Sequence, residues 1–141
     1  MADPQLDPAE VSVSFGAGVY FNDPKEITLN AVYNAVRSPQ TALIAKIEHL
    51  RRLVDNGERD EYKERKRSLP AYCLSGTFQC DGKRPPKNED LIQHSGRLQI
   101  DIDQLEQPRV ESEAVRGRFG QDPHIEITHL SPSGRGVKAA I

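Results

Sequence analysis

The spacing of apolar residues changes from a helical to a strand-like period about halfway along the chain. Between residues 29 and 54, apolar side chains recur every three or four positions, which predicts two helices, one starting near Thr28 and one starting at Ser38-Pro39. After Leu69-Pro70, apolar and polar residues alternate instead, most clearly over residues 98–103, and this alternation predicts strands with one buried face. Because helices precede a series of closely connected strands, the order of elements favours an α+β domain.

Further elements follow from periodicity and from turn-forming residues. Residues 1–10 contain two prolines and are expected to form a disordered lead-in. The densely charged stretch 58–67 predicts a short exposed helix. The last strand, over residues 137–141, is expected at an open sheet edge. The other predicted segments are a strand over 11–15, a loop over 16–25, strand segments over 72–78, a polar loop over 80–90, a helix over 110–119, a strand over 125–130 and a turn over 131–136.

The composition excludes several classes of protein. A chain of 141 residues suits one domain, which we divide into a helical part over 11–70 and a sheet-forming part over 71–141. No apolar run approaches the roughly 18 residues of a membrane span, and the first residues do not form a secretory signal, so we expect a cytoplasmic protein without a membrane partner. The net charge of -2 argues against binding nucleic acid by bulk charge but allows a local basic groove. Two cysteines provide neither a disulfide scaffold nor a zinc site.

Two acidic residues share one face of a predicted strand. Ile100 and Ile102 turn toward the core, so Asp101 and Asp103 point to the other face, with Cα atoms roughly 6.5–7 Å apart. Two carboxylates this close repel each other unless a cation lies between them, and their oxygens suit Mg²⁺ or Mn²⁺. The pattern therefore predicts that Asp101 and Asp103 are catalytic metal ligands for phosphoryl transfer. The alternative is a solvated strand face that carries two acids.

A glycine-rich turn with two basic residues lies near the C-terminus. Its glycines allow the backbone to approach a ligand closely, and successive amides in such a turn can form an anion-binding nest. Its spacing is not that of a P-loop, and a hairpin turn with a basic tip is the alternative. If the turn joins strands that pair beside the acid-bearing strand, phosphate donors and metal ligands converge. The predicted nucleotide-binding residues are Ser131, Ser133, Gly134, Arg135, Gly136 and Lys138.

A run of three basic residues ends the charged stretch. Arg65, Lys66 and Arg67 follow several acidic residues, and Glu61 precedes Arg65 at the favourable helical spacing of four. The usual meaning of such a stretch is an exposed helix. The functional interpretation is that Arg65, Lys66 and Arg67 contact a nucleic-acid backbone.

Five short motifs, taken in order, resemble a known family. They are similar to the N-terminal domain associated with virulence-associated protein E, which occurs in phage and mobile-element replication proteins. That family resembles a branch of the archaeo-eukaryotic primase, or primase–polymerase, superfamily. The resemblance runs from about residue 11 to the C-terminus. The motifs are Leu69-Pro70-Ala71, Ser75-Gly76-Thr77-Phe78, His94-Ser95-Gly96, Asp101-Ile102-Asp103 and the stretch 131–138.

The resemblance implies an RRM-like, mainly antiparallel catalytic sheet. It also implies a primase–polymerase-type nucleotidyltransferase that acts with a divalent metal on nucleoside triphosphates and a single-stranded template, in phage or mobile-element replication, beside a helicase-like domain or partner. Asp101 and Asp103 match the acid pair that binds metal. The superfamily's phosphate-contacting histidine is missing from the turn, so its role passes to Ser133 and Lys138, with His129 as a substitute.

The resemblance also implies a third acidic motif after the glycine-rich turn. The sequence reaches Ile141 without one, so the sheet looks truncated at its C-terminus. We therefore expect this chain alone to be inactive and a longer parent protein to be active. Two other functions stay open: a non-catalytic module that binds nucleotide or nucleic acid, and a metal-dependent nuclease.

Overall fold

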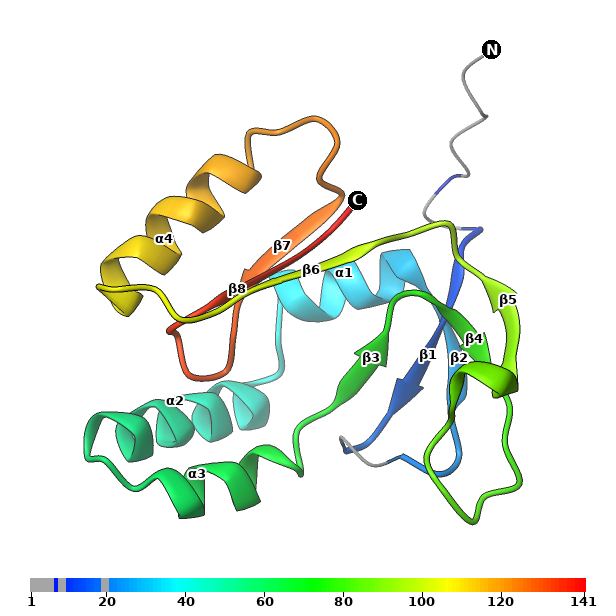
Figure 1. Cartoon of the computed structure of the whole chain (residues 1–141), viewed down its shortest axis with the longest axis horizontal. Coiled ribbons are helices and arrows are strands. Elements are labelled where there is room, and N and C mark those ends of the chain that lie inside the picture. Colours follow the sequence, from blue (N-terminus) through cyan, green and yellow to red (C-terminus); the bar gives the residue numbers. More distant parts are fainter. Residues whose placement is uncertain (1–6, 8–9, 19–20) are drawn as a thin grey trace. The chain divides into compact units, whose positions relative to one another are not determined.

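The computed structural model describes residues 7, 10–18 and 21–141, and these residues form an α+β fold (Figure 1). The predicted α+β class is confirmed, and every strand pairing described is antiparallel. The described strands are divided among three sheets of three, two and three strands. Most of the predicted lead-in over residues 1–10 falls outside the described residues.

The chain divides into two compact units, and each takes one segment from before residue 70 and one from after it. Unit 1 contains the described residues up to Pro39 together with Pro70–Arg97. Unit 2 contains Gln40–Leu69 and Leu98–Ile141. The chain passes from one unit to the other between Leu69 and Pro70, next to the division that the sequence suggested, and also at residues 39–40 and 97–98. No helix in the described part of the chain is long and apolar enough to cross a membrane.

Unit 1 is built around the strand β1 (Ser12–Gly16), which lies between its two partners. Val13 is fully buried on β1, as the alternating pattern predicts. Ser14 is also buried, and its hydroxyl accepts a hydrogen bond of 2.9 Å from the backbone N–H of Phe78 in the neighbouring hairpin. The other elements of unit 1 are β2 (Lys25–Thr28), α1 (Leu29–Arg37), β3 (Ala71–Cys73), β4 (Gly76–Phe78), the short helix η1 (Asn88–Asp90) and β5 (Leu91–His94).

The helices of unit 2 follow the predicted periodicity. They are α2 (Thr41–Asp55), α3 (Arg59–Lys66) and α4 (Pro108–Phe119). The helix α2 begins after Gln40, two residues later than the predicted start at Ser38-Pro39. Apolar residues on α2 and α3 pack together with Leu69, which removes their apolar surface from water and holds the two helices against each other. This cluster contains Leu43, Ile47, Leu50, Leu53, Tyr62 and Leu69.

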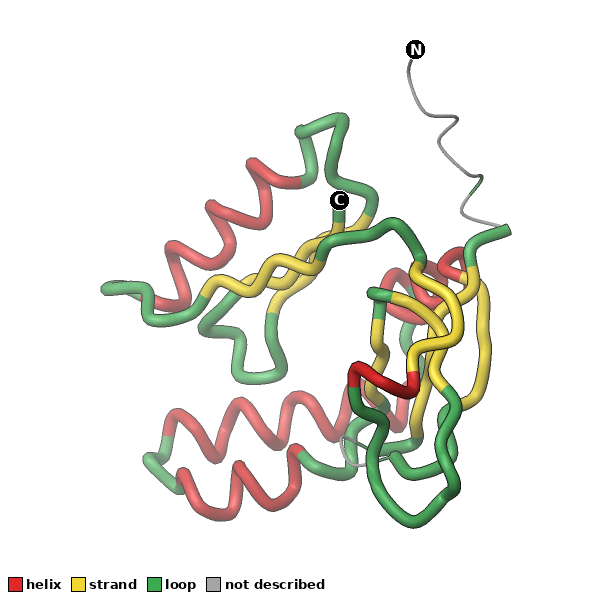
Figure 2. Tube along the Cα trace, turned by 45° about the vertical axis from the view of Figure 1, so that its right-hand side comes forward, coloured by secondary structure: helices red, strands yellow, loops and turns green. Residues whose placement is uncertain are grey.

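The sheet of unit 2 has the strand order β6-β8-β7. Its strands are β6 (Gln99–Ile102), β7 (Ile127–Leu130) and β8 (Val137–Ala140). The prediction that the C-terminal strand lies at an open edge was wrong, because β8 is the central strand and pairs on both sides. Within unit 2, α4 lies on one side of the sheet and the pair α2–α3 on the other, and the turn between β7 and β8 reaches toward α2 (Figures 1 and 2).

Candidate functional site

The acid pair lies where β6 ends. Asp101 is in the strand and Asp103 follows it directly, and both are exposed, whereas Ile100 and Ile102 are partly buried. This alternation is the expected one, because successive side chains of a strand point to opposite faces. Lys138 lies directly opposite Asp101 on β8, and its ammonium group donates a hydrogen bond to the Asp101 carboxylate. Asp101 is therefore already paired with a cation from this chain.

Three polar side chains form a row across the sheet of unit 2. Lys138 on the central strand pairs in register with Asp101 on one side and with His129 on the other. Residues directly opposite one another in adjacent strands share a face, so a base, a cation and an acid lie side by side. The Nδ1 atom of His129 lies 2.9 Å from the backbone oxygen of Leu130. The structure thus places His129 beside the site that the sequence predicted.

The glycine-rich turn is held by its own hydrogen bonds. The amide of Ser131 donates to the carbonyl of Gly136 (2.8 Å), and the amide of Gly134 donates to the carbonyl of Ser131 (2.8 Å). The hydroxyl of Ser133 lies 3.0 Å from that of Ser131 and accepts from the amide of Arg135 (3.2 Å). The amides of Gly134 and Arg135 are thus used within the turn, so they do not form the anion-binding nest that the sequence suggested.

The turn and the acid pair meet at Gly136. A Cβ atom at this position would lie 2.5 Å from Oδ1 of Asp103 and 2.7 Å from the backbone oxygen of Ile102. Only a residue without a side chain lets the end of β6 approach so closely. The structure therefore brings Asp103 against the turn that carries Arg135 and leads into β8, the strand of Lys138.

The helix α3 reaches the same place through Tyr62. Burial raises the pKa of the Tyr62 phenol, the hydrogen bond with Ser133 lowers it, and the nearby negative charge of Asp103 raises it further. The ammonium group of Lys66 lies 5.9 Å from the centre of the Tyr62 ring, within the range of a cation–π interaction. Part of the basic run predicted to contact nucleic acid therefore lies near the turn.

The other two residues of that run lie at the end of α3. The Nε atom of Arg65 donates a hydrogen bond of 2.6 Å to the carboxylate of Glu61, as their spacing of four residues predicts. Arg67 is exposed and caps the C-terminal end of the helix.

Sequence reasoning missed an arginine cluster around Gly134, made of Arg51, Arg109 and Arg135 with Asp55. Nη2 of Arg109 lies 2.6 Å from each carboxylate oxygen of Asp55, and Nη2 of Arg135 lies 3.5 Å from one of them. The hydrogen bond from Arg109 is the main reason why the pKa of Asp55 is below its ordinary value. The residues of the cluster come from α2, α4 and the turn, so no local sequence pattern predicts it.

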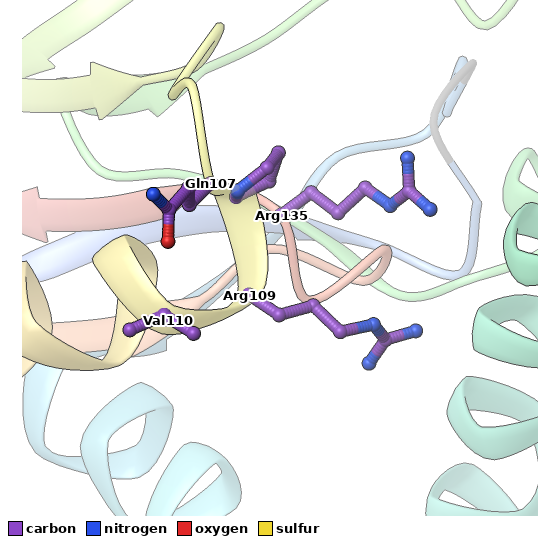
Figure 3. Close-up of a pocket in the computed structure, with 5 residues that line it drawn as sticks. Gln107, Arg109, Val110 and Arg135 are labelled. Carbon is purple, nitrogen blue, oxygen red and sulfur yellow. The ribbon is translucent and has the colours of Figure 1, made fainter.

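A shallow pocket of about 290 Å³ lies beside the arginine cluster. Figure 3 shows the side chains of Arg109 and Arg135 running in the same direction from the first turn of α4 and from the glycine-rich turn. The pocket is lined by Gln107, Pro108, Arg109, Val110 and Arg135.

The carboxylates of Asp101 and Asp103 are too few to hold a metal ion by themselves. They suit a cation that is also bound by a substrate. Among the described residues, no group of three or more acidic, histidine or cysteine side chains is placed to hold a metal ion. Mg²⁺ is commonly bound by one or two carboxylates together with waters and substrate phosphates, which matches the donor set of Asp101 and Asp103. The geometry thus suits a metal that arrives with a phosphate ligand.

Comparison with known proteins corrects the family suggested by the short motifs. The sequence model for the BT4734-like, N-terminal domain matches residues 64–141, which is more than half of the chain. This is a different family from the domain associated with virulence-associated protein E, so the predicted resemblance was wrong. No curated protein and no solved structure matches the chain. By the family match, this chain belongs to the family of BT4734-like N-terminal domains.

Proposed function

We propose that unit 2 binds a nucleoside triphosphate together with a divalent cation and serves nucleotidyl transfer. The observation that carries this proposal is the contact at Gly136, which places the Asp103 carboxylate against the turn that carries Arg135 and leads into β8 with Lys138. Metal ligands and phosphate-binding groups side by side are what phosphoryl transfer requires, because positioning and charge stabilisation supply most of its catalysis. The proposal rests on this geometry alone.

Asp101 and Asp103 would hold Mg²⁺ or Mn²⁺ with oxygens of the triphosphate. When bound, such a cation neutralises charge on the phosphate chain and positions the attacking oxygen. Lys138 now neutralises Asp101. A cation on Asp101 would take over that role, and the ammonium group of Lys138 would be free to turn toward a phosphate. Arg135 adds a guanidinium, which suits phosphate oxygens because it can donate two parallel hydrogen bonds.

The proposed reaction joins a hydroxyl group to the α-phosphate of the triphosphate. The hydroxyl oxygen forms a bond to the α-phosphorus, the bond from that phosphorus to the bridging oxygen breaks, and pyrophosphate leaves with the bonding electrons. The hydroxyl proton passes to solvent water. A single-stranded nucleic acid is the proposed source of the hydroxyl and of the template, and its backbone would lie along Lys66 and its neighbours Arg65 and Arg67 at the end of α3.

One observation favours a non-catalytic variant of this function. A two-metal transfer site needs ligands for both ions, and among the described residues no third acidic, histidine or cysteine side chain joins Asp101 and Asp103 in a group that could hold a metal. In that variant the chain binds the triphosphate and its cation, and chemistry requires a carboxylate from elsewhere.

Titration with a fluorescent nucleoside triphosphate, with and without Mg²⁺, tests the proposal. We expect Mg²⁺ to tighten binding in the wild type, and Asp101→Asn and Asp103→Asn to abolish this gain. Glu48→Gln is the matched control, because it removes one negative charge from an exposed position on α2. Binding that is insensitive to Mg²⁺, or equal in all four proteins, would refute the proposal.

Primer synthesis on single-stranded DNA with the same proteins separates catalysis from binding. Product that is lost in both aspartate variants supports transfer by this chain. Cation-dependent binding without product supports the non-catalytic variant.

A further inference from the structure

We infer that the arginine cluster of Arg51, Arg109 and Arg135 binds the terminal phosphates of a polyphosphate ligand, and that Asp55 occupies this position until the ligand displaces it. This inference rests on the proposed function in one respect, because that function supplies the ligand as a nucleoside triphosphate. The chemistry of the site, a pyrophosphate-like anion on guanidinium groups, can be tested without a nucleotide and without a metal.

The charges of the cluster do not balance. The cluster contains three guanidinium groups and one carboxylate, that of Asp55, which leaves an excess of two positive charges. Arg109 binds that carboxylate closely, at 2.6 Å to each oxygen, whereas Arg135 reaches only one oxygen, at 3.5 Å. The oxygens of a phosphate group would give Arg135 the close contact that Asp55 does not provide.

Two guanidinium nitrogens in the cluster are buried donors, the Nε atoms of Arg51 and Arg135. Neither donates a hydrogen bond to an acceptor among the described residues. A buried donor without an acceptor destabilises a fold, so such groups call for an explanation. A phosphate group in the cluster would bring the acceptors that these donors lack.

The cluster is also accessible to a ligand. The side chains of Arg109, Arg135 and Asp55 are 46%, 42% and 47% exposed. The adjoining pocket of about 290 Å³ is slightly smaller than the ~300–1,000 Å³ that is common for sites of small ligands. The first turn of α4 lines this pocket, and the positive end of the helix dipole adds to the attraction for an anion.

The position of the cluster fits one end of a phosphate chain. The guanidinium of Arg51 approaches Gly134, with Nε at 3.3 Å from an ideal Cβ, and that of Arg109 lies at 3.6 Å. Asp103 touches the same turn at Gly136. Two residues of backbone span at most about 7 Å, so Asp103 and the arginines contact positions of the turn that are close together. A triphosphate could contact the proposed cation at one end and the arginine cluster at the other.

Calorimetric titration of inorganic pyrophosphate in the presence of a metal chelator tests the inference on the full chain. We expect binding by the wild type, and at least a tenfold loss in Arg51→Gln and in Arg109→Gln. We expect Asp55→Asn to bind more tightly, by up to about fivefold, because the ion pair that competes with the ligand is exposed and therefore weak. Arg116→Gln is the matched control on α4, because Arg116 pairs with Glu113 and not with Asp55.

Absence of pyrophosphate binding, unchanged binding in both arginine variants, or no gain in Asp55→Asn would overturn the inference. If a variant does not fold, the side-chain Nε–H signals of Arg51 and Arg135 in the wild type decide the matter by NMR. They must shift on addition of pyrophosphate, and constant signals overturn the inference. Binding of a single-stranded oligonucleotide in place of pyrophosphate overturns it too.

The two proposals fail in different ways. Metal-free pyrophosphate binding without any Mg²⁺-dependent nucleotide binding leaves the cluster standing and refutes the proposed function. Mg²⁺-dependent nucleotide binding that is unaffected by Arg51→Gln and Arg109→Gln supports the proposed function and refutes the role of the arginine cluster.

Discussion

Replacing Gly136 by alanine tests the contact between the turn and the acid pair. The new Cβ would lie 2.5 Å from Oδ1 of Asp103 and 2.7 Å from the backbone oxygen of Ile102. Ordinary contacts begin near 3.4 Å, so both distances are about 1 Å too short. The Asp103 side chain can rotate away, but the Ile102 oxygen belongs to β6 and moves only if the pairing of β6 with β8 is distorted.

We expect Gly136→Ala to lower the free energy of unfolding by about 1–3 kcal/mol, the usual cost of overpacking. For a chain of this size, the loss corresponds to a fall in Tm of about 4–12 °C, measured by circular dichroism. Mg²⁺ should also increase the affinity for the triphosphate less in this variant, because the added Cβ displaces the Asp103 carboxylate from the turn.

Gly117→Ala is the matched control for this substitution. Gly117 lies inside α4, and an added Cβ would meet nothing within 4 Å. Alanine there should raise the free energy of unfolding by about 0.5–1 kcal/mol, because glycine is a poor helix former. If Gly136→Ala is as stable as the wild type while Gly117→Ala behaves as expected, the close approach of β6 to the turn is refuted.

Three further predictions concern stability. Thr28 caps α1 with its hydroxyl, so Thr28→Ala should cost about 1 kcal/mol in urea unfolding, whereas Thr28→Ser should cost much less. Ser14→Ala removes the acceptor for the Phe78 amide and should cost about 1–2 kcal/mol, and an unchanged urea midpoint would contradict the hydrogen bond. The pKa of Asp55 is lowered, chiefly by Arg109, so its contribution to stability is present above about pH 4 and is lost as the pH falls through the folded pKa. Asp55→Asn should therefore flatten the acid limb of a plot of Tm against pH.

The elements with a strong period were predictable from the sequence. The four helices fell where apolar spacing or dense charge placed them, and β6 followed from the alternation of Ile100 and Ile102 with acids. The strands β2 and β5 were missed. All four residues of β5 are exposed, so no alternation between buried and exposed positions marks it, and its strand form depends on pairing with β4.

The pairing of distant strands and the family of the chain could not be predicted from local sequence patterns. The position of β8 at the centre of its sheet depends on two partners, one about 40 residues away in β6 and one across the turn. The arginine cluster likewise joins side chains that lie far apart in the sequence, such as Asp55 and Arg109. Short motifs pointed to the wrong family, because a few residues such as Asp101-Ile102-Asp103 occur in unrelated chains.

The central claim is that Asp101 and Asp103 bind a divalent cation together with a triphosphate held at the turn. Paramagnetic broadening of backbone NMR signals by Mn²⁺, measured with and without a non-hydrolysable nucleoside triphosphate, tests it most directly. We expect the signals of Asp101, Asp103 and Gly136 to broaden at low Mn²⁺ only when the triphosphate is present, while that of Gly117 stays sharp. Equal broadening with and without triphosphate, or none at the acid pair, would contradict the account.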